Sequence, residues 1–403
     1  MCPRTNPGFT PVNALDILAD DNIPRVETAF GPFGTVRRMP GRDMSAPDVA
    51  GADVLLVRSV TPVGPELLGG TDLTFVGSAT IGTDHVDRAH LRSRGIPFAH
   101  APGSNADSVA DYVVAALLRL AHRRGVSLQG RTVGIVGCGN IGERLARRLP
   151  ALGMEVLKND PPRARAAEAK GRSHAFVPLD TVLDAAEIVT LHVPLKEAGP
   201  DPTHHLVDEA FLDCLRDGAW LLNTSRGAVV DGEALRTARR RGAMGAAVLD
   251  VWEHEPAPDP ALIEAADLAT PHIAGYAYDG KVRGTEMLYE ALCVELDVEP
   301  DWGGTATIQP VSRDALRCRV PDPRLPAGDW RHHLARQAYD PQTDDAALRA
   351  LTDLDAEARG DAFGTLRGTY RRRREMQQHS VPGRIIPPEH RRAVEDGLTI
   401  RLD

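Results

Sequence analysis

The sequence predicts an α/β protein built around a doubly wound, dinucleotide-binding domain. Two observations carry this prediction: short apolar runs alternate with helical stretches along most of the chain, and a glycine-rich turn at residues 137–142 joins one apolar run to the helix after it. Strands that alternate with helices are typical of βαβ units, in which helices cover both faces of a parallel sheet. Because 403 residues exceed the size of an ordinary domain, we expect two or three domains.

The first part of the chain predicts one α/β unit followed by a long helix. Its apolar runs end in polar or glycine-containing turns, which is typical of buried strands. The predicted strands are residues 15–18, 54–57, 73–76 and 96–99. From Asn105 to Arg124 apolar residues recur at helical spacing, so we expect a long helix that connects this unit with the next.

A second run of βα units begins at Thr132. The strands predicted here are residues 132–136, 155–157, 188–193, 220–224, 246–250 and 267–269. The helices expected between them include residues 143–152 and 231–241. With right-handed crossovers these units form one dinucleotide-binding domain. A helical pattern resumes after Gly280 and breaks at Pro300, and roughly the last hundred residues predict a small third domain rather than a disordered tail.

Composition argues against several classes of protein. The chain is 42% hydrophobic and 26% charged, which is typical of a globular protein with a sizeable core. No apolar run approaches the roughly 18 residues that a membrane helix needs, and residues 1–13 lack the apolar segment of a secretory signal. A net charge of −9 argues against a nucleic-acid-binding surface. The five cysteines are odd in number and form no CxxC pair, so we expect free thiols in a reducing cytoplasm and no metal centre.

The glycine-rich turn predicts a nucleotide site. Gly137, Gly139 and Gly142 form a G-x-G-x-x-G pattern that follows a predicted strand and opens a predicted helix. The first glycine permits a tight turn, the second lets the backbone approach a pyrophosphate, and the third allows close packing of helix on strand. The alternative is a glycine-rich turn that binds nothing.

The nucleotide is expected to be NAD. Asp160 ends the next strand, 18 residues after Gly142, where a carboxylate accepts hydrogen bonds from the adenosine ribose and repels a 2′-phosphate. Arg163 and Arg165 follow closely and keep NADP open as an alternative.

Three side chains are candidates for catalysis, because each follows the carboxyl end of a predicted strand of the second unit. Arg226 offers a fork suited to a carboxylate, His272 is a candidate proton acceptor, and Glu255 is a candidate partner that raises the pKa of an adjacent imidazole by about one to three units. The local sequence makes Glu253 as good a candidate as Glu255. The histidines that rival His272 by residue type are His85, His192, His204 and His205.

These segments, in this order, resemble the D-isomer-specific 2-hydroxyacid dehydrogenases. The resemblance covers roughly residues 14–295, and its most specific part is Thr270-Pro271-His272-Ile273-Ala274-Gly275-Tyr276 with Gly280-Lys281-Val282-Arg283-Gly284-Thr285. These stretches, with Val57-Arg58-Ser59-Val60-Thr61, are similar to the branch of the family that oxidises 4-phospho-D-erythronate on the way to pyridoxal 5′-phosphate. In the tail, residues 363–367 and 370–375 fit the dimerisation domain of that branch.

The resemblance implies a fold and a domain order. A Rossmann-type domain at residues 116–277 would be inserted in a flavodoxin-like α/β substrate domain formed by residues 1–115 and 278–298. Residues 299–403 would form a small α+β dimerisation domain, which makes a cytoplasmic homodimer the expected form. Residues 1–13 extend beyond the start of the family.

The resemblance also implies the roles of individual residues. His272 would transfer the proton, with Arg226 and Glu255 as its catalytic companions, and the substrate would contact Ser59, Thr80 and Tyr276. The expected cofactor contacts, besides the three glycines, are Asn140, Ile141, Asp160, Val193, Thr224, Ser225, Arg226, Asp250 and Gly275.

The implied reaction is the NAD-dependent oxidation of 4-phospho-D-erythronate to (3R)-3-hydroxy-2-oxo-4-phosphooxybutanoate. A doubly charged phosphate calls for cations beyond Arg226, and Arg58, Lys281 and Arg283 are the candidates. One alternative is another D-2-hydroxyacid dehydrogenase that acts on phosphoglycerate, glycerate or lactate. The other is a non-catalytic, NAD-sensing protein similar to the corepressors that share this fold, because a fold alone does not fix a function.

Overall fold

The computed structural model describes residues 14–306, 308, 316–322, 325 and 327–403, and its chain separates into two compact units. The first unit consists of residues 1–105 and 279–309, and the second of residues 106–278 and 310–403. Predictions that concern residues 1–13, including Cys2, lie outside the described residues.

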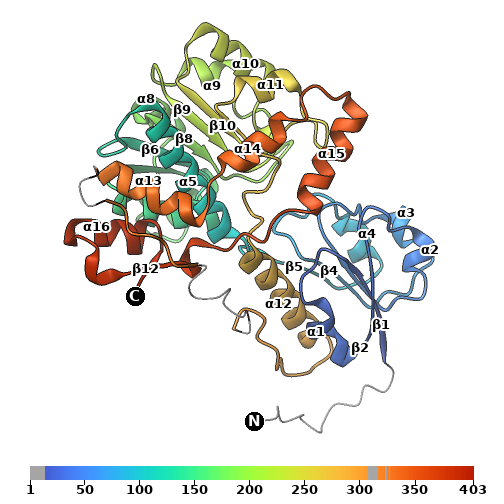
Figure 1. The fold of residues 1–403 in the computed structure, drawn as a ribbon. Helices are drawn as coiled ribbons and strands as arrows, with labels where there is room; N and C mark the ends of the chain where they lie inside the picture. Colours follow the sequence, from blue (N-terminus) through green and yellow to red (C-terminus); the bar gives the residue numbers. More distant parts are fainter. Residues whose placement is uncertain (1–13, 307, 309–315, 323–324, 326) are drawn as a thin grey trace. The chain divides into compact units, whose positions relative to one another are not determined.

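The first unit contains a five-stranded parallel sheet in the order β2-β1-β3-β4-β5 (Figure 1). This is the flavodoxin-like order. The strands are β1 (Leu15–Asp20), β2 (Gly34–Met39), β3 (Val54–Val57), β4 (Phe75–Ser78) and β5 (Phe98–His100). The helices are α1 (Val26–Phe30), α2 (Ala46–Val49), α3 (Pro65–Leu68), α4 (Arg88–Ser93) and α12 (Tyr278–Glu295). Separate apolar clusters cover the two faces of the sheet, so β3 and β4 are buried on both sides.

One strand of this sheet was not expected. β2 reads Gly-Thr-Val-Arg-Arg-Met and lies at the edge of the sheet, where its residues are only partly buried. An edge strand needs no continuous apolar run, and the two adjacent arginines, Arg37 and Arg38, discourage association with the edge of another chain. The apolar pattern of the sequence therefore gave no signal for β2.

The second unit contains a six-stranded parallel sheet in the order β11-β10-β9-β8-β6-β7. Its strands are β6 (Thr132–Val136), β7 (Glu155–Asn159), β8 (Ile188–Leu191), β9 (Trp220–Asn223), β10 (Ala246–Leu249) and β11 (Leu268–Ala269). All six predicted strands are therefore present, with small differences at their ends. The strand order reverses beside β6, and ligands of open α/β sheets bind outside the carboxyl ends of the strands at such a point.

Helices cover both faces of this sheet (Figure 1). α5 (Ala106–Arg124) and α6 (Asn140–Ala151) belong to one apolar cluster, and the helices of the opposite face belong to another. The remaining helices between the strands are α7 (Pro161–Glu168), α8 (Leu179–Ala185), α9 (Glu209–Asp213), α10 (Gly232–Arg241) and α11 (Pro260–Ala265), with a short turn of 3-10 helix, η2, at Gly227–Val229. These two parallel sheets confirm the predicted α/β class.

The C-terminal residues pack on the second unit. Trp330, Leu334, Met376 and Leu398 are almost fully buried in the same apolar cluster as α5 and α6. The elements are α13 (Ala327–Ala338), α14 (Gln342–Arg349), α15 (Ala356–Gly368), η4 (Met376–Gln378), β12 (Ser380–Val381), η5 (Gly383–Ile385), α16 (Pro388–Arg392), η6 (Ala393–Gly397) and β13 (Arg401–Leu402). In Figure 1, α13 lies against α5.

The three-domain division into residues 1–115 with 278–298, 116–277 and 299–403 stays a prediction, and the contacts within the chain group it into two units. The expected boundary after residue 115 falls within α5, which belongs in full to the second unit. Residues 327–403 share the core of that unit, because Trp330, Leu334 and Met376 are buried in the same apolar cluster as α5 and α6.

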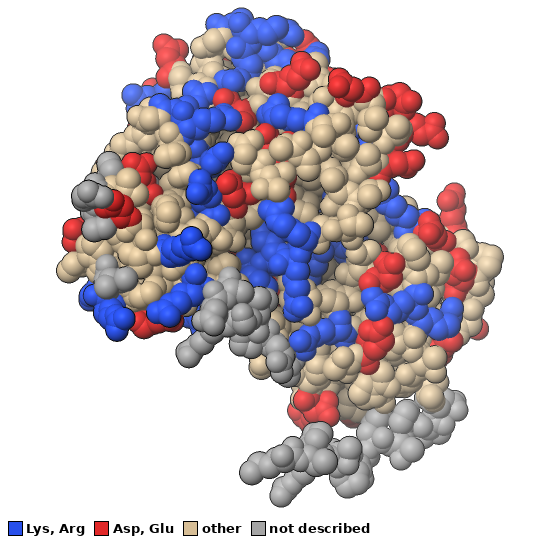
Figure 2. Space-filling view, viewed as in Figure 1, with Lys and Arg blue, Asp and Glu red and all other residues tan. Residues whose placement is uncertain are grey.

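The basic side chains of α10 are paired with acidic neighbours. Figure 2 shows basic side chains gathered over α10, at the top of the view. Arg239, Arg240 and Arg241 in its last turn form ion pairs with Asp267, Glu233 and Asp213 respectively. None of the helices in the described part of the chain has the length and apolar character needed to cross a bilayer.

Candidate active site

The glycine-rich turn has the backbone geometry that a dinucleotide site requires. Gly137 has φ +90°, and a Cβ there would lie 2.5 Å from the carbonyl oxygen of His192. A Cβ on Gly142 would lie 2.2 Å from the carbonyl oxygen of Gly137, so the third glycine lets α6 approach the turn closely. Gly139 has open space around it and caps the N-terminus of α6, where backbone N–H groups favour an anion.

Asp160 joins the turn to the next βα connection. Its Oδ2 accepts a hydrogen bond of 2.9 Å from the backbone N–H of Cys138, and its Oδ1 accepts one of 3.0 Å from Arg163, so the carboxylate also caps α7. The Arg163 side chain forms an ion pair of 2.8 Å with Glu143, and Arg165 is paired with Asp201. Both arginines that kept NADP open are thus engaged with carboxylates.

Arg226 lies in the loop that follows β9, and hydrogen bonds of the Asn223 side chain hold this loop in place. The Asn223 side chain accepts hydrogen bonds from the backbone N–H and the hydroxyl of Ser225 and donates one of 2.8 Å to the carbonyl of Arg226. The loop also packs on the connection after β10, because a Cβ on Gly227 would lie 1.9 Å from the carbonyl of Trp252. This contact holds the Arg226 segment beside the Glu255 segment.

His272 and Glu255 form a hydrogen-bonded pair. His272 Nδ1 lies 2.7 Å from Glu255 Oε2, and the two side chains are 31% and 22% exposed. The other carboxylate oxygen accepts a hydrogen bond of 2.9 Å from the backbone N–H of Trp252. Burial by itself raises the pKa of Glu255, but the charge of His272, its hydrogen bond and the charge of Arg367 outweigh burial and lower that pKa. The carboxylate therefore stays ionised beside the imidazole.

Asp250 braces the loop that carries His272. It is 1% exposed, and its carboxylate accepts hydrogen bonds of 2.7 to 2.9 Å from the Thr270 hydroxyl and from the backbone N–H groups of Ile273 and Ala274. Burial raises its pKa to about 6, against the charge of His272 and these three hydrogen bonds. Asp250 was predicted to contact the cofactor, and in the structure its oxygens hold the loop at residues 270–276, which carries the candidate His272.

Hydrogen bonds and ring contacts distinguish Glu255 and His272 from the other glutamate and histidines that the sequence left as candidates. Glu253 lies 2.5 Å from His205 Nε2, so Glu255 and not Glu253 is the partner of His272. His192 is hydrogen-bonded to Thr190 and Thr224, and burial lowers its pKa to about 3. His204 stacks on His205, and His85 lies in the first unit against Ser78.

The remaining predicted cofactor residues are grouped around the same strand ends. Thr224 and Ser225 are buried directly after β9, and the Val193 side chain lies against Gly137 after β8. Asn140 and Ile141 open α6, and Gly275 belongs to the loop braced by Asp250.

In the first unit, Ser59 and Thr80 follow the adjacent strands β3 and β4. Ser59 is exposed, and the Thr80 hydroxyl is hydrogen-bonded to Ser78 and to the carbonyl of Gly82. Arg58 is 7% exposed, and its charge opposes the rise that burial causes in the pKa of Asp20. Arg283 donates a hydrogen bond of 2.8 Å to the carbonyl of Ser104, and Lys281 is partly buried on α12.

Sequence reasoning missed the contacts that reach the loop at residues 270–276 from distant segments. The Tyr112 hydroxyl on α5 lies 2.7 Å from Thr270 Oγ1. The Tyr276 ring meets Tyr370 edge to face, with 5.8 Å between centroids, and the Arg367 guanidinium lies 5.4 Å from the centre of the same ring. No spacing rule links positions so far apart in the chain, so only the structure brings these side chains together.

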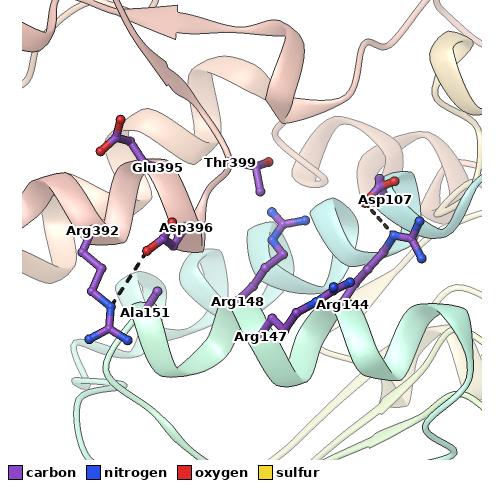
Figure 3. A pocket seen from close by; sticks show the side chains of 9 residues that line it. All are labelled: Asp107, Arg144, Arg147, Arg148, Ala151, Arg392, Glu395, Asp396 and Thr399. Carbon is purple, nitrogen blue, oxygen red and sulfur yellow. Dashed lines mark hydrogen bonds and ion pairs between the residues drawn. The ribbon is translucent and has the colours of Figure 1, made fainter.

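A separate pocket of about 380 Å³ lies where α6 meets the C-terminal residues (Figure 3). Three of its four arginines are paired: Arg144 with Asp107, Arg148 with Asp111 and Arg392 with Asp396. Because most of its arginines are ion-paired, this pocket does not compete with the strand ends as a candidate catalytic centre. Within the described residues, no group of three or more histidine, cysteine or acidic side chains is arranged to hold a metal ion.

Comparisons with known proteins place this chain among dehydrogenases, in agreement with the site described above. The family model described as "D-isomer specific 2-hydroxyacid dehydrogenase, NAD binding domain" matches residues 106–274. The erythronate-4-phosphate dehydrogenase of Salinibacter ruber is 76% identical over 392 residues, which cover 97% of this chain and 100% of that protein. The erythronate-4-phosphate dehydrogenase of Pseudomonas syringae pv. tomato is 46% identical over 370 residues, or 90% of this chain and 93% of that protein.

Solved structures agree with the fold. The TT0316 protein of Thermus thermophilus superposes with a TM-score of 0.59 at 30% identity, over 71% of this chain and 99% of that one. The D-lactate dehydrogenase of Aquifex aeolicus, solved with NAD and lactic acid, superposes with a TM-score of 0.58 at 26% identity, over 70% of this chain and 95% of that one. These findings confirm the expected resemblance and the NAD cofactor. The chain therefore belongs to the erythronate-4-phosphate dehydrogenases of the D-isomer specific 2-hydroxyacid dehydrogenase family, a family of NAD-dependent oxidoreductases.

Proposed function

We propose that this chain oxidises 4-phospho-D-erythronate to (3R)-3-hydroxy-2-oxo-4-phosphooxybutanoate with NAD, a step in the synthesis of pyridoxal 5′-phosphate. The observation that carries the proposal is the His272–Glu255 pair at the carboxyl ends of the strands of the nucleotide-binding sheet. The names of the relatives support the choice of substrate. The phosphoglycerate, glycerate, lactate and NAD-sensing alternatives are not favoured, because the D-lactate dehydrogenase among the similar structures is only 26% identical to this chain.

The residues of the glycine-rich turn fit NAD. The open space at Gly139, the N-terminus of α6 and the Asp160 carboxylate are suited to the pyrophosphate and the adenosine ribose. NAD, when bound, accepts a hydride from C2 of the substrate.

The residues of this chain handle the proton and the charges. Because His272 Nδ1 is hydrogen-bonded to Glu255, Nε2 is the ring nitrogen that takes the proton of the C2 hydroxyl. The ionised Glu255 stabilises the resulting imidazolium, which later releases the proton to solvent. Arg226 binds the substrate carboxylate and the C2 oxygen. Ser59, Thr80 and Tyr276 contact the rest of the substrate, and at least one of Arg58, Lys281 and Arg283 contacts its phosphate.

The active form is proposed to be a cytoplasmic homodimer. The support is the likeness of the C-terminal segment to a dimerisation domain and the free thiols of Cys138, Cys214, Cys293 and Cys318. Analytical ultracentrifugation tests the assembly: we expect a dimer, and a monomer at assay concentrations contradicts it.

The experiment that tests the function is NADH formation with 4-phospho-D-erythronate beside D-3-phosphoglycerate, D-lactate and D-glycerate. An α-keto acid is included to reoxidise tightly held NADH. We expect a clear preference for 4-phospho-D-erythronate in kcat/KM. Preference for another hydroxy acid keeps the reaction class and rejects the substrate, and NAD binding without turnover of any of them favours the sensor alternative.

A further inference from the structure

Arg367 lies beside the catalytic loop without a hydrogen-bond partner. It sits in the last turn of α15, and its guanidinium carbon lies 5.4 Å from the centre of the Tyr276 ring and 5.9 Å from that of Phe363. Its Nε is buried and unpaired, and among the described residues its side chain makes no hydrogen bond or ion pair. A buried guanidinium N–H that has lost water and gained no partner costs free energy, so an anion that accepts a hydrogen bond from it relieves that cost.

The fold fixes Arg367 in this place. The Asp355 side chain accepts a hydrogen bond from the backbone N–H of Ala358 and caps the start of α15. The helix packs on the segment that follows Glu255, since a Cβ on Gly360 would lie 3.6 Å from Pro256. Phe363, one turn before Arg367, is fully buried in the core of the second unit. The guanidinium is thus held by a packed helix and not by a mobile loop.

Glu255 does not use the N–H groups of Arg367. Its Oε1 accepts from the backbone N–H of Trp252 and its Oε2 is bonded to His272, while Arg367 affects it only through its charge, which helps to lower the pKa of Glu255. The guanidinium is therefore close to the proton-transfer pair, yet its donors remain available to a bound anion.

We propose that Arg367 binds the phosphate group of the substrate and thereby selects phosphorylated hydroxy acids. This inference rests on the proposed function, in which Arg226 binds the carboxylate and the phosphate needs a second cation. An arginine suits this role because its planar fork donates two parallel hydrogen bonds to phosphate oxygens. Arg58, Lys281 and Arg283, the candidates from the sequence, all belong to the first unit, whereas Arg367 on α15 contacts the Tyr276 ring within the second unit.

The position of Arg367 agrees with a selective role. Arg367 lies beyond the family model, which ends at residue 274, and two solved structures that align over 95–99% of their own length cover only 70–71% of this chain. Residues outside the shared dehydrogenase framework are suited to distinguish one hydroxy acid from another, because the catalytic pair is common to the reaction class.

The test compares two substrates that differ only in the phosphate. The variants Arg367→Ala and Arg367→Lys are assayed with 4-phospho-D-erythronate and with D-erythronate. A hydrogen bond to a charged group contributes about 1.5–3 kcal/mol, so we expect Arg367→Ala to lower kcat/KM for the phosphorylated substrate by about 10- to 100-fold, mostly through KM. The value for D-erythronate should change less than about threefold, and lysine should restore part of the loss.

Arg372→Ala is the matched control, because Arg372 lies in the same segment and stacks on Tyr278 at 3.7 Å. This variant removes the same charge and a similar ring contact, and kcat/KM for both substrates should stay nearly unchanged. NAD affinity and the melting temperature should match the wild type in all three variants, which shows that any loss is not a folding defect.

Binding is also measured in the inactive His272→Ala background, so that the result does not depend on D-erythronate being turned over. Calorimetry with NAD present should show that Arg367→Ala weakens the binding of 4-phospho-D-erythronate and leaves the binding of D-erythronate unchanged. Equal losses for both ligands, together with a shifted pH profile in the active enzyme, would mean that Arg367 acts through Glu255 and would overturn the proposal. An unchanged affinity for 4-phospho-D-erythronate would overturn it as well.

The failure of this inference is distinguishable from the failure of the proposed function. If the wild type oxidises D-3-phosphoglycerate instead, the substrate assignment is wrong. Arg367→Ala should then still lower the affinity for D-3-phosphoglycerate much more than the affinity for D-glycerate.

Discussion

The glycine-rich turn and the catalytic loop lie at the same edge of one sheet, yet they are built differently. The turn is almost self-contained: Gly137 and Gly142 contact each other and the neighbouring strand end, and Asp160 joins them from the next connection. The catalytic loop at residues 270–276 is held by Asp250 after β10, by Tyr112 on α5 and by the C-terminal segment. A nucleotide site can thus be encoded locally, whereas the proton-transfer site depends on residues from the whole unit.

The largest effect should follow from removing the imidazole. His272→Ala takes away the group that accepts the C2 hydroxyl proton, and general base catalysis contributes about 10²- to 10⁴-fold to a rate. We expect kcat to fall by a factor in that range while the affinity for NAD, measured by calorimetry, stays within about twofold. A parallel loss of NAD affinity would show that the two regions are not separable.

The next largest effect should separate the two local carboxylates. Glu255→Gln removes the charge that stabilises the imidazolium, so we expect kcat to fall by about 10- to 100-fold. Glu253→Gln is the control, because Glu253 is paired with His205. Similar losses in both variants would contradict the assignment of Glu255.

Acid stability offers an independent measurement on the same pair. The pKa of Glu255 is lower in the folded chain than its usual value near 4.3, so the folded state binds this proton less tightly than the unfolded state. Its contribution to stability is therefore present above about pH 4.3 and is lost as the pH falls through the lower, folded value. Urea unfolding should show a difference between wild type and Glu255→Gln at pH 6 that shrinks toward pH 3.

A smaller effect should distinguish two glycines of the turn. Gly137→Ala places a Cβ at φ +90° and 2.5 Å from a carbonyl oxygen, which costs about 1–3 kcal/mol of stability and weakens NAD binding. Gly139→Ala meets no protein atom within 4 Å, so the melting temperature should be unchanged while NAD affinity falls because the backbone must approach the pyrophosphate. Equal destabilisation by both would contradict the local geometry.

The same contrast explains what the sequence could predict. Strands such as β3 and β9 are buried on both faces, so their apolar runs reveal their ends, and the candidates Arg226, Glu255 and His272 lie in the connections after β9, β10 and β11. Glu255 and Glu253 could not be separated, because the choice depends on whether His205 or His272 faces each carboxylate. Arg367 left no signal at all, since its place is set by how α15 packs on Pro256.

The smallest effect should come from losing the hydrogen bond between Tyr112 and Thr270, which supports the loop without touching the proton-transfer pair. Tyr112→Phe removes the hydroxyl that lies 2.7 Å from Thr270 Oγ1, and a buried hydrogen bond contributes about 0.5–1.5 kcal/mol. Thr270 keeps its bond to Asp250, so the loop should stay in place: we expect a loss of about 1 kcal/mol in the free energy of unfolding and less than a threefold change in kcat. A much larger fall in kcat at unchanged stability would mean that α5 positions His272 directly and that the catalytic loop has little tolerance for movement at its base.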